Sequence, residues 1–253
     1  MDIRPLIFAA LLAACTATGP GAVPSTPPAV YEDEGQSPLL NWSLTYPAAV
    51  AAIPPLADSL RAVFAREKAD NFATAATDQA ERSKQGYPFH SYELANAFAI
   101  AGSTPALLSI TNEWMAYTGG AHPNHGTTAI LWDRPAGRAI ALSELTGGVA
   151  VLDRLYRDAF CTALTAERAR RRGGVDAASA PGDLFSACPK LAELTVIPAG
   201  SAAGGPMTRL TFHADPYVAG PYVEGNYDIA LPVTAAFVAS LKPAYQASFA
   251  ASP

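Results

Sequence analysis

The spacing of apolar residues changes along this chain, and this change limits the folds open to it more than any other feature. Residues 40–46 alternate between apolar and polar side chains, which predicts a half-buried strand. Between residues 54 and 86 the apolar residues follow helical spacing instead, and two prolines mark the beginning of an amphipathic helix. Strands and helices then follow one another without regular strand–helix–strand alternation. We therefore expect an α+β fold of mainly antiparallel sheets packed with amphipathic helices.

The same two spacings predict the other elements. Residues 92–100 and 108–117 are expected to be antiparallel neighbours across a turn at 102–105. Further strands are expected at 128–132, 194–197, 207–213 and 227–231, and helices at 151–164 and 234–242. We divide the folded part into two similar-sized subdomains, an N-terminal one at 39–118 and a C-terminal one at 119–245, followed by a tail at 246–253.

Length and charge exclude several classes of protein. The 253 residues are enough to bury a sizeable core, and 50% hydrophobic against 15% charged residues excludes both disorder throughout and a coiled coil. With 17 basic against 22 acidic residues, the net charge of -5 provides no basic surface for a nucleic-acid partner. We therefore expect no nucleic-acid binding.

The first residues are typical of an export signal. Nine apolar residues, Leu6–Ala14, follow the basic Arg4 and end at Cys15. As a helix this run rises only about 14 Å, too little for a hydrocarbon core of about 30 Å. The tetrad LAAC at 12–15 resembles the bacterial lipobox, so residues 1–14 are expected to be a lipoprotein signal peptide and Cys15 the lipidated residue. An ordinary signal peptide with an incidental cysteine is the alternative.

The segment after the signal has the composition of a tether. Within the segment 15–38, residues 16–37 carry prolines at positions 20, 24, 27 and 28 and no periodic apolar pattern, and the acidic residues 32–34 are interpreted as solubilising charge. We expect a lipid-anchored, Pro-rich tether that holds the folded part at the membrane, in the periplasmic compartment of a bacterial cell envelope. Thr16, rather than aspartate, follows Cys15 and favours the outer membrane.

The two remaining cysteines are expected to pair. Cys161 and Cys188 lie in a chain predicted to reach a compartment where disulfides persist. Two buried free thiols are the alternative. Neither cysteine has the neighbours of a nucleophile, and two thiols do not make a zinc site.

A basic cluster follows the helix predicted at 151–164. Arg168, Arg170, Arg171 and Arg172 precede a Gly-Gly pair, which suits the C-terminus of a helix. We interpret the cluster as a solvated helix end rather than as an anion-binding patch.

The densest polar segment is the loop of Tyr117, Thr118, Gly119, Gly120, Ala121 and His122, with His125 close behind it. His122 and His125 could bind one metal ion, with Glu113 or Asp133 as a third ligand, but HxxH is a weak signal and the sequence fixes no third ligand. The favoured interpretation is structural: both glycines supply positive φ and close backbone approach, and His122 bonds to a neighbouring carbonyl. This loop would then be a fold-determining turn with no bound metal.

No catalytic motif is apparent elsewhere in the sequence. A hydrolase needs a nucleophile beside a base, and no GxSxG or SxxK pattern is present. His213 and Asp215 form the only other His/Asp pair, which we expect to cap a strand. We therefore expect no catalytic residue and no cofactor, and keep a metal-dependent periplasmic hydrolase using His122 and His125 as the alternative.

Two segments resemble one known family. Residues 113–124, EWMAYTGGAHPN, are followed by a strand, a glycine turn and ALSEL at 141–145, and this order resembles the YTGGAH signature of the RsiV/PdaC-like extracytoplasmic domains. Residues 217–232 are similar to the final loop and strand of that family's C-terminal domain of unknown function. The resemblance extends over about residues 39–245, with a PdaC-like first subdomain and an RsiV-like second one.

This resemblance implies an envelope-binding role. Relatives include a lysozyme-sensing anti-sigma-factor ectodomain and the non-catalytic region attached to a peptidoglycan deacetylase. The sequence shows no transmembrane helix, anti-sigma segment or deacetylase domain, so signalling and deacetylation are not expected to transfer. We expect a non-catalytic envelope lipoprotein that binds a periplasmic protein or glycan, lysozyme-like or related to peptidoglycan.

Overall fold

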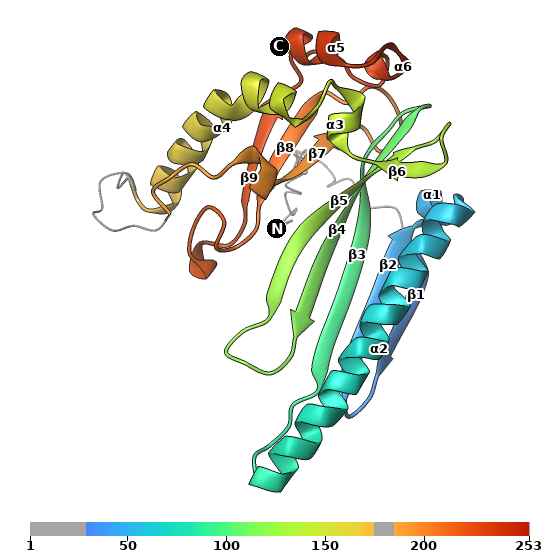
Figure 1. The fold of residues 1–253 in the computed structure, drawn as a ribbon, viewed down its shortest axis with the longest axis vertical. Helices are drawn as coiled ribbons and strands as arrows, with labels where there is room; N and C mark the ends of the chain where they lie inside the picture. The colour runs from blue at the N-terminus through green and yellow to red at the C-terminus, as the bar shows by residue number, and fades with distance from the viewer. Residues whose placement is uncertain (1–28, 175–184, 253) are drawn as a thin grey trace, which may run out of the picture.

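The computed structural model describes residues 29–174 and 185–252, which form two sheets with helices on their faces (Figure 1). The first sheet has six strands in the order β1-β2-β3-β4-β5-β6, and the second has the order β7-β8-β9. The first sheet consists of β1 (Ala29–Gln36), β2 (Leu40–Pro47), β3 (Tyr92–Ser103), β4 (Leu107–Tyr117), β5 (Asn124–Asp133) and β6 (Arg138–Ile140). The second consists of β7 (Thr195–Ala199), β8 (Arg209–Ala214) and β9 (Tyr227–Pro232).

Two long helices cover these sheets. They are α2 (Pro54–Gln85) and α4 (Val149–Arg171). The short helical segments are α1 (Ala48–Ala51), α3 (Leu142–Leu145), η2 (Leu191–Glu193), η3 (Tyr222–Glu224), α5 (Ala235–Ser240) and α6 (Pro243–Gln246). The predicted α+β class is confirmed, and the paired strands are antiparallel except for β2 and β3, which run parallel.

Helix α2 begins and ends where the sequence predicts. Its first turn contains two prolines, and Gly86 ends it with φ 74, a left-handed conformation that glycine adopts without a steric penalty. Leu56, Leu60 and Phe64 are buried against the first sheet. The parallel pairing of β2 with β3 needs a crossover connection, and α2 supplies it.

Residues 29–36 correct the predicted tether, because they form the edge strand β1 rather than an extended linker. The ring of Tyr31 stacks on that of Tyr46, with centroids 4.6 Å apart. Asp33 accepts hydrogen bonds from the Trp42 indole at 2.9 Å and from Lys68 Nζ at 2.7 Å. The bond from Lys68 is the largest cause that lowers the pKa of Asp33. Asp33, which suggested solubilising charge, therefore holds an edge strand, whereas Glu32 and Glu34 are exposed. The sequence had no apolar alternation to reveal this strand.

The strands β4 and β5 supply both apolar cores. Leu108, Ile110 and Trp132 belong to the core under α2, whereas Leu107 and Leu131 belong to the core under α4. Figure 1 shows these strands running from the region of α2 to the second sheet. The predicted boundary at 118/119 is therefore wrong: β5 pairs with β4 from end to end, and the first sheet continues to Ile140. A glycine-rich hairpin turn has the same composition as a domain linker, which is why the sequence misled.

The second core lies between α4 and the sheet of β7, β8 and β9. Tyr156 and Phe160 of α4 pack with Phe212 of β8, with ring centroids 5.5 and 5.6 Å apart.

In the described residues, 29–174 and 185–252, no helix is long and apolar enough to cross a membrane. The predicted signal peptide and the lipidation residue Cys15 lie outside the described residues.

Candidate binding site

The predicted motif loop connects β4 to β5 as a hairpin turn. Tyr117 Oη donates to the carbonyl of Gly120 at 3.1 Å, and Nδ1 of the exposed His122 lies 3.0 Å from the carbonyl of Pro123. Gly119 has φ 82, so its predicted positive φ is confirmed. The same prediction for Gly120 is wrong, since its φ is not positive and open space surrounds the position of a Cβ. A single left-handed residue is enough for the chain to turn here.

This difference predicts unequal effects for the two glycines. Gly119→Ala should lower the free energy of unfolding by about 1 kcal/mol, because a Cβ is penalised in the left-handed region. Gly120→Ala should stay within about 0.5 kcal/mol of wild type, as expected of an unstrained surface position. Urea denaturation of both variants checks this. Equal losses would show that the loop's backbone is not as described.

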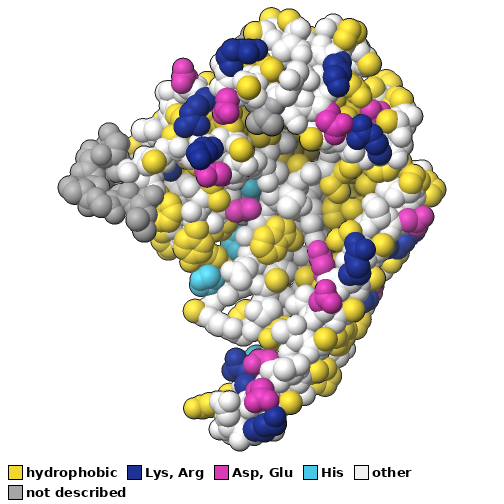
Figure 2. Space-filling view, in the orientation of Figure 1, with side chains coloured by type: hydrophobic (Ala, Val, Ile, Leu, Met, Phe, Trp, Pro, Cys, Tyr) yellow, Lys and Arg dark blue, Asp and Glu magenta, His cyan; other side chains and the backbone are white. Residues whose placement is uncertain are grey.

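The hairpin turn meets a second loop that comes from the C-terminal half. Tyr222, in η3, donates from its hydroxyl to the carbonyl of Pro123 at 2.8 Å. The His122 ring stacks on the Tyr222 ring with centroids 3.8 Å apart, and His125 approaches the same ring edge-on at 5.4 Å. The Tyr217 ring also lies beside the Tyr222 ring, with centroids 5.8 Å apart. We call His122, His125, Tyr217 and Tyr222 the aromatic cluster; in Figure 2, histidines appear beside apolar side chains on this part of the surface.

Tyr217 is the most unusual residue of the aromatic cluster. Among the described residues it is the only non-glycine with positive φ, 72°, and 57% of its surface is exposed. A bulky residue in the left-handed region is a true conformational outlier. The neighbouring Val223 is 89% exposed, so the loop presents apolar surface that does not support the core.

The arginines at the end of α4 hold this loop in place. Arg171 donates to the carbonyls of Glu224 and Asn226 at 2.7 and 2.6 Å and lies over the Tyr227 ring, 3.9 Å from its centroid. Arg172 forms an ion pair with Glu224 at 2.7 Å. Glu224 also accepts from the hydroxyl of Tyr227, whose pKa is raised to about 12 by burial and by this carboxylate.

The predicted solvated helix end is therefore wrong for three of the four arginines. Arg168 is only 3% exposed, and it donates to the carbonyls of Ala219, Ala187 and Ser186 at 2.8, 3.2 and 3.5 Å. Only Arg170, exposed and paired with Glu167, fits the prediction. Their acceptors are mostly backbone carbonyls of a distant loop, which no spacing in the sequence encodes.

Among the described residues, no third metal ligand stands beside the two motif histidines. Both rings pack against Tyr222, Glu113 is exposed on β4, and Asp133 ends β5 at the far end of the strand from His125. Nowhere in the described ranges does a group of three or more His, Cys, Asp or Glu side chains stand where it could hold a metal ion. The two histidines therefore contribute aromatic surface to this part of the molecule.

His213 of β8 is connected to the first sheet through Asp215. It is 3% exposed, and its Nδ1 and Nε2 lie 2.6 Å from Asp228 and 2.8 Å from Asp215. Asp215 also accepts from the backbone N–H of Thr127 on β5 at 2.8 Å. A Cβ at Gly126 would lie 2.8 Å from the Asp215 carboxylate, so only glycine permits this approach. His213 therefore has the structural role at a strand end that the sequence suggested.

This cluster predicts a dependence of stability on pH. Burial lowers the pKa of His213, but hydrogen bonds to Asp228 and Asp215 outweigh burial, and the pKa is raised above 6.5. A raised folded-state pKa gives stability that is complete below the unfolded pKa and is lost as pH rises through the folded pKa. The stability difference between wild type and His213→Gln should therefore be larger at about pH 5.5 than at about pH 8.5. Urea denaturation at both pH values measures it, and an equal difference would contradict a charged His213.

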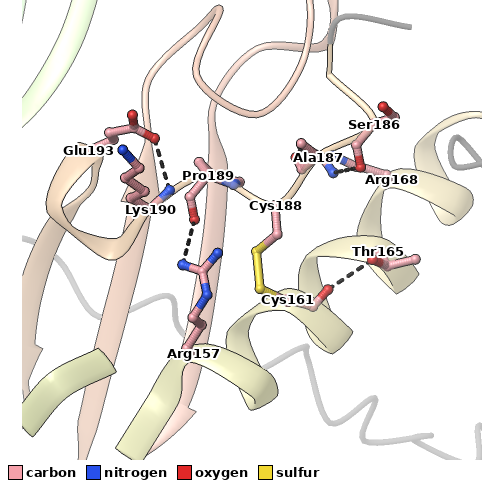
Figure 3. The surroundings of a disulfide bond; sticks show 10 residues. All are labelled: Arg157, Cys161, Thr165, Arg168, Ser186, Ala187, Cys188, Pro189, Lys190 and Glu193. Atoms are coloured by element: carbon pink, nitrogen blue, oxygen red, sulfur yellow. Dashed lines mark hydrogen bonds between the residues drawn. A yellow bond between two sulfur atoms is a disulfide. The ribbon is translucent and has the colours of Figure 1, made fainter. Parts of the chain in front are cut away.

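The predicted disulfide is present. Cys161 of α4 bonds to Cys188, which precedes η2 (Figure 3). Arg157 and Arg168 donate to backbone carbonyls on either side of Cys188, at Pro189 and Ala187. The disulfide therefore secures to α4 the segment whose carbonyls Arg168 binds.

Comparisons with known proteins find a family match in the first half of the chain and a similar fold over most of its length. Residues 34–125 match the family described as Deacetylase PdaC. This segment is a PdaC-family domain. The chain is similar in fold to a DUF3298 family protein from Pseudomonas aeruginosa, with a TM-score of 0.51, 15% identity, and coverage of 84% of this chain and 93% of that one.

A second solved structure, a DUF3298 family member from Bacteroides fragilis, is 17% identical, with a TM-score of 0.45 and coverage of 80% and 88% of the two chains. No curated protein matches this chain. The PdaC match begins within β1, in the segment that the sequence had placed in the tether, and it ends inside β5, so the hairpin turn belongs to the matched domain.

Proposed function

We propose that this chain is a non-catalytic, lipid-anchored binding protein of the bacterial cell envelope, and that its ligand, a periplasmic protein or a glycan, contacts the aromatic cluster. The observation that carries this proposal is the conformation of Tyr217. A non-glycine residue in the left-handed region costs about 1–2 kcal/mol, and glycine would relieve that cost. Such strain is retained where a site needs it, and here it presents an exposed aromatic ring.

The chemistry of the aromatic cluster supports binding. Tyrosine is enriched at protein interfaces and binding hot spots because it offers a large apolar face with a polar tip. Arg171 and Arg172 fix the loop that carries these rings before any ligand arrives, which lowers the entropy that association costs. A protein such as lysozyme and a peptidoglycan strand are the two ligands that the family resemblance suggests.

Catalysis is not part of the proposal. The family description of residues 34–125 names a deacetylase. In this segment, however, the rings of His122 and His125 pack against the Tyr222 ring. The motif of this chain therefore provides a contact surface. Recombinant protein should sediment with purified peptidoglycan or be retained on immobilised lysozyme. Binding to neither would overturn the proposed ligands.

The anchor needs its own experiment. Cells expressing wild type should incorporate labelled palmitate into this protein, and Cys15→Ala should abolish the labelling and release the protein from the membrane fraction. Separation of inner and outer membranes should place the wild type in the outer membrane. Equal labelling of the two proteins would show that Cys15 is not the lipidated residue.

A further inference from the structure

A groove remains open beside α2, on the side of the first sheet away from the edge strand β1. It has a volume of about 510 Å³ and lies between α2 and the strands β3, β4 and β5. Its apolar walls include Phe98 and Ile130, which are partly buried, and Val63, which is 44% exposed at its rim. Figure 2 shows this face, with acidic side chains on α2 beside apolar side chains over the strands. A volume of this order is typical of small-ligand sites.

A chain of polar side chains crosses the groove. Asn96 Nδ2 donates to Glu67 Oε2 at 3.2 Å, and Asn112 Nδ2 donates to Asn96 Oδ1 at 2.6 Å. The Glu67 carboxylate can only accept, so Asn96 must turn its NH₂ toward it, and Asn112 must in turn give its NH₂ to Asn96. This series of hydrogen bonds therefore ends at Asn112 Oδ1, which is buried and receives no hydrogen bond.

The groove thus lacks hydrogen-bond donors for two acceptors. Asn112 is 8% exposed, and a buried acceptor without a donor costs about 1–3 kcal/mol. The second oxygen of Glu67 receives no hydrogen bond from the described residues. A ligand that brings hydrogen-bond donors would therefore satisfy both acceptors.

The charge of the groove further restricts the class of ligand that it can bind. No lysine, arginine or histidine is among its described lining residues, so the Glu67 charge has no opposite charge there. Lys68, the next residue of α2, forms an ion pair with Asp33 and lies over the Trp42 ring instead. Trp114 also lines the groove, and the face of an indole attracts cations.

We propose that this groove binds a primary ammonium group on an alkyl stem, as on a lysine side chain of a partner protein. The ammonium pairs with Glu67 and supplies the missing donors, while the stem packs against Phe98 and Trp114. An ammonium carries three donors and no acceptor, which matches a site rich in free acceptors. This inference concerns a different surface from the aromatic cluster and can fail independently of it.

Calorimetric titration with three small probes tests it. Nα-acetyl-lysine methylamide should bind, whereas Nα-acetyl-norleucine methylamide, which keeps the stem and lacks the ammonium, should bind at least tenfold more weakly. Chitotriose serves as a neutral glycan and should not compete. Glu67→Gln should reduce lysine binding at least tenfold, and Glu113→Gln, an exposed glutamate on the opposite face of β4, should leave it unchanged.

Three results would overturn the proposal. Equal binding of the lysine and norleucine probes would make the groove an apolar site, and this comparison needs only wild-type protein. Binding of chitotriose with retained affinity in Glu67→Gln would make it a neutral glycan site. No detectable binding of the lysine probe would also contradict it.

Discussion

Arg168→Ala should destabilise the protein by about 3–5 kcal/mol, the order of loss expected when a long, buried and hydrogen-bonded side chain is truncated. The guanidinium is buried at the end of α4 and donates to three carbonyls of two separate segments. Its removal leaves those carbonyls without their donor and opens a cavity. Because about 2–4 °C of melting temperature corresponds to 1 kcal/mol in a chain of this size, the expected loss is about 10 °C.

A neighbouring arginine provides the control. Arg170 lies two residues further along α4, its side chain is 70% exposed, and it pairs with Glu167 on the surface. Arg170→Ala should change the stability by no more than about 0.5 kcal/mol. If both variants melted alike, Arg168 would be the solvated residue that the sequence suggested, and the described anchoring of the loop would be wrong.

Removal of the disulfide should have the second largest effect. Cys161 and Cys188 close a loop with a sequence separation of 27, which in the chain-entropy model corresponds to about 3.5 kcal/mol. The Cys161→Ser/Cys188→Ser double variant should therefore unfold at a clearly lower urea concentration than wild type. The reducing agent dithiothreitol should lower the urea midpoint of the wild type to that of the double variant. It should leave the midpoint of the double variant unchanged. A wild-type midpoint that dithiothreitol does not change would contradict the disulfide.

Periodicity predicted much of the fold. Helix α2 and the strands β2, β3 and β4 lie within a few residues of their predicted positions, because each has a clear apolar face and turn or cap residues at its ends. Strand β1 was missed because its stability comes from Tyr31 and Asp33, whose partners Tyr46 and Lys68 lie on other elements. Local patterns do not contain such pairings.

The candidate site was predicted only in part. The sequence marked the turn that carries His122, but not Tyr222, whose ring stacks on it from a loop about a hundred residues later. It also could not indicate the strained conformation of Tyr217, because φ is a property of the folded loop. Spacing along the chain reveals helix and strand faces; a cluster assembled from two halves depends on tertiary packing.

The stability and the ligand affinity of Tyr217→Gly together test whether the aromatic cluster is the binding surface. Glycine relieves the left-handed strain, so the variant should be as stable as wild type or more stable, by up to about 1 kcal/mol. Its affinity for the peptidoglycan or lysozyme ligand should nevertheless fall at least tenfold, because an exposed aromatic contact is lost. Tyr87→Gly, which removes an exposed tyrosine just after α2, is the matched control and should bind like wild type. A Tyr217→Gly protein that binds with wild-type affinity would contradict the assignment of the aromatic cluster as the binding surface.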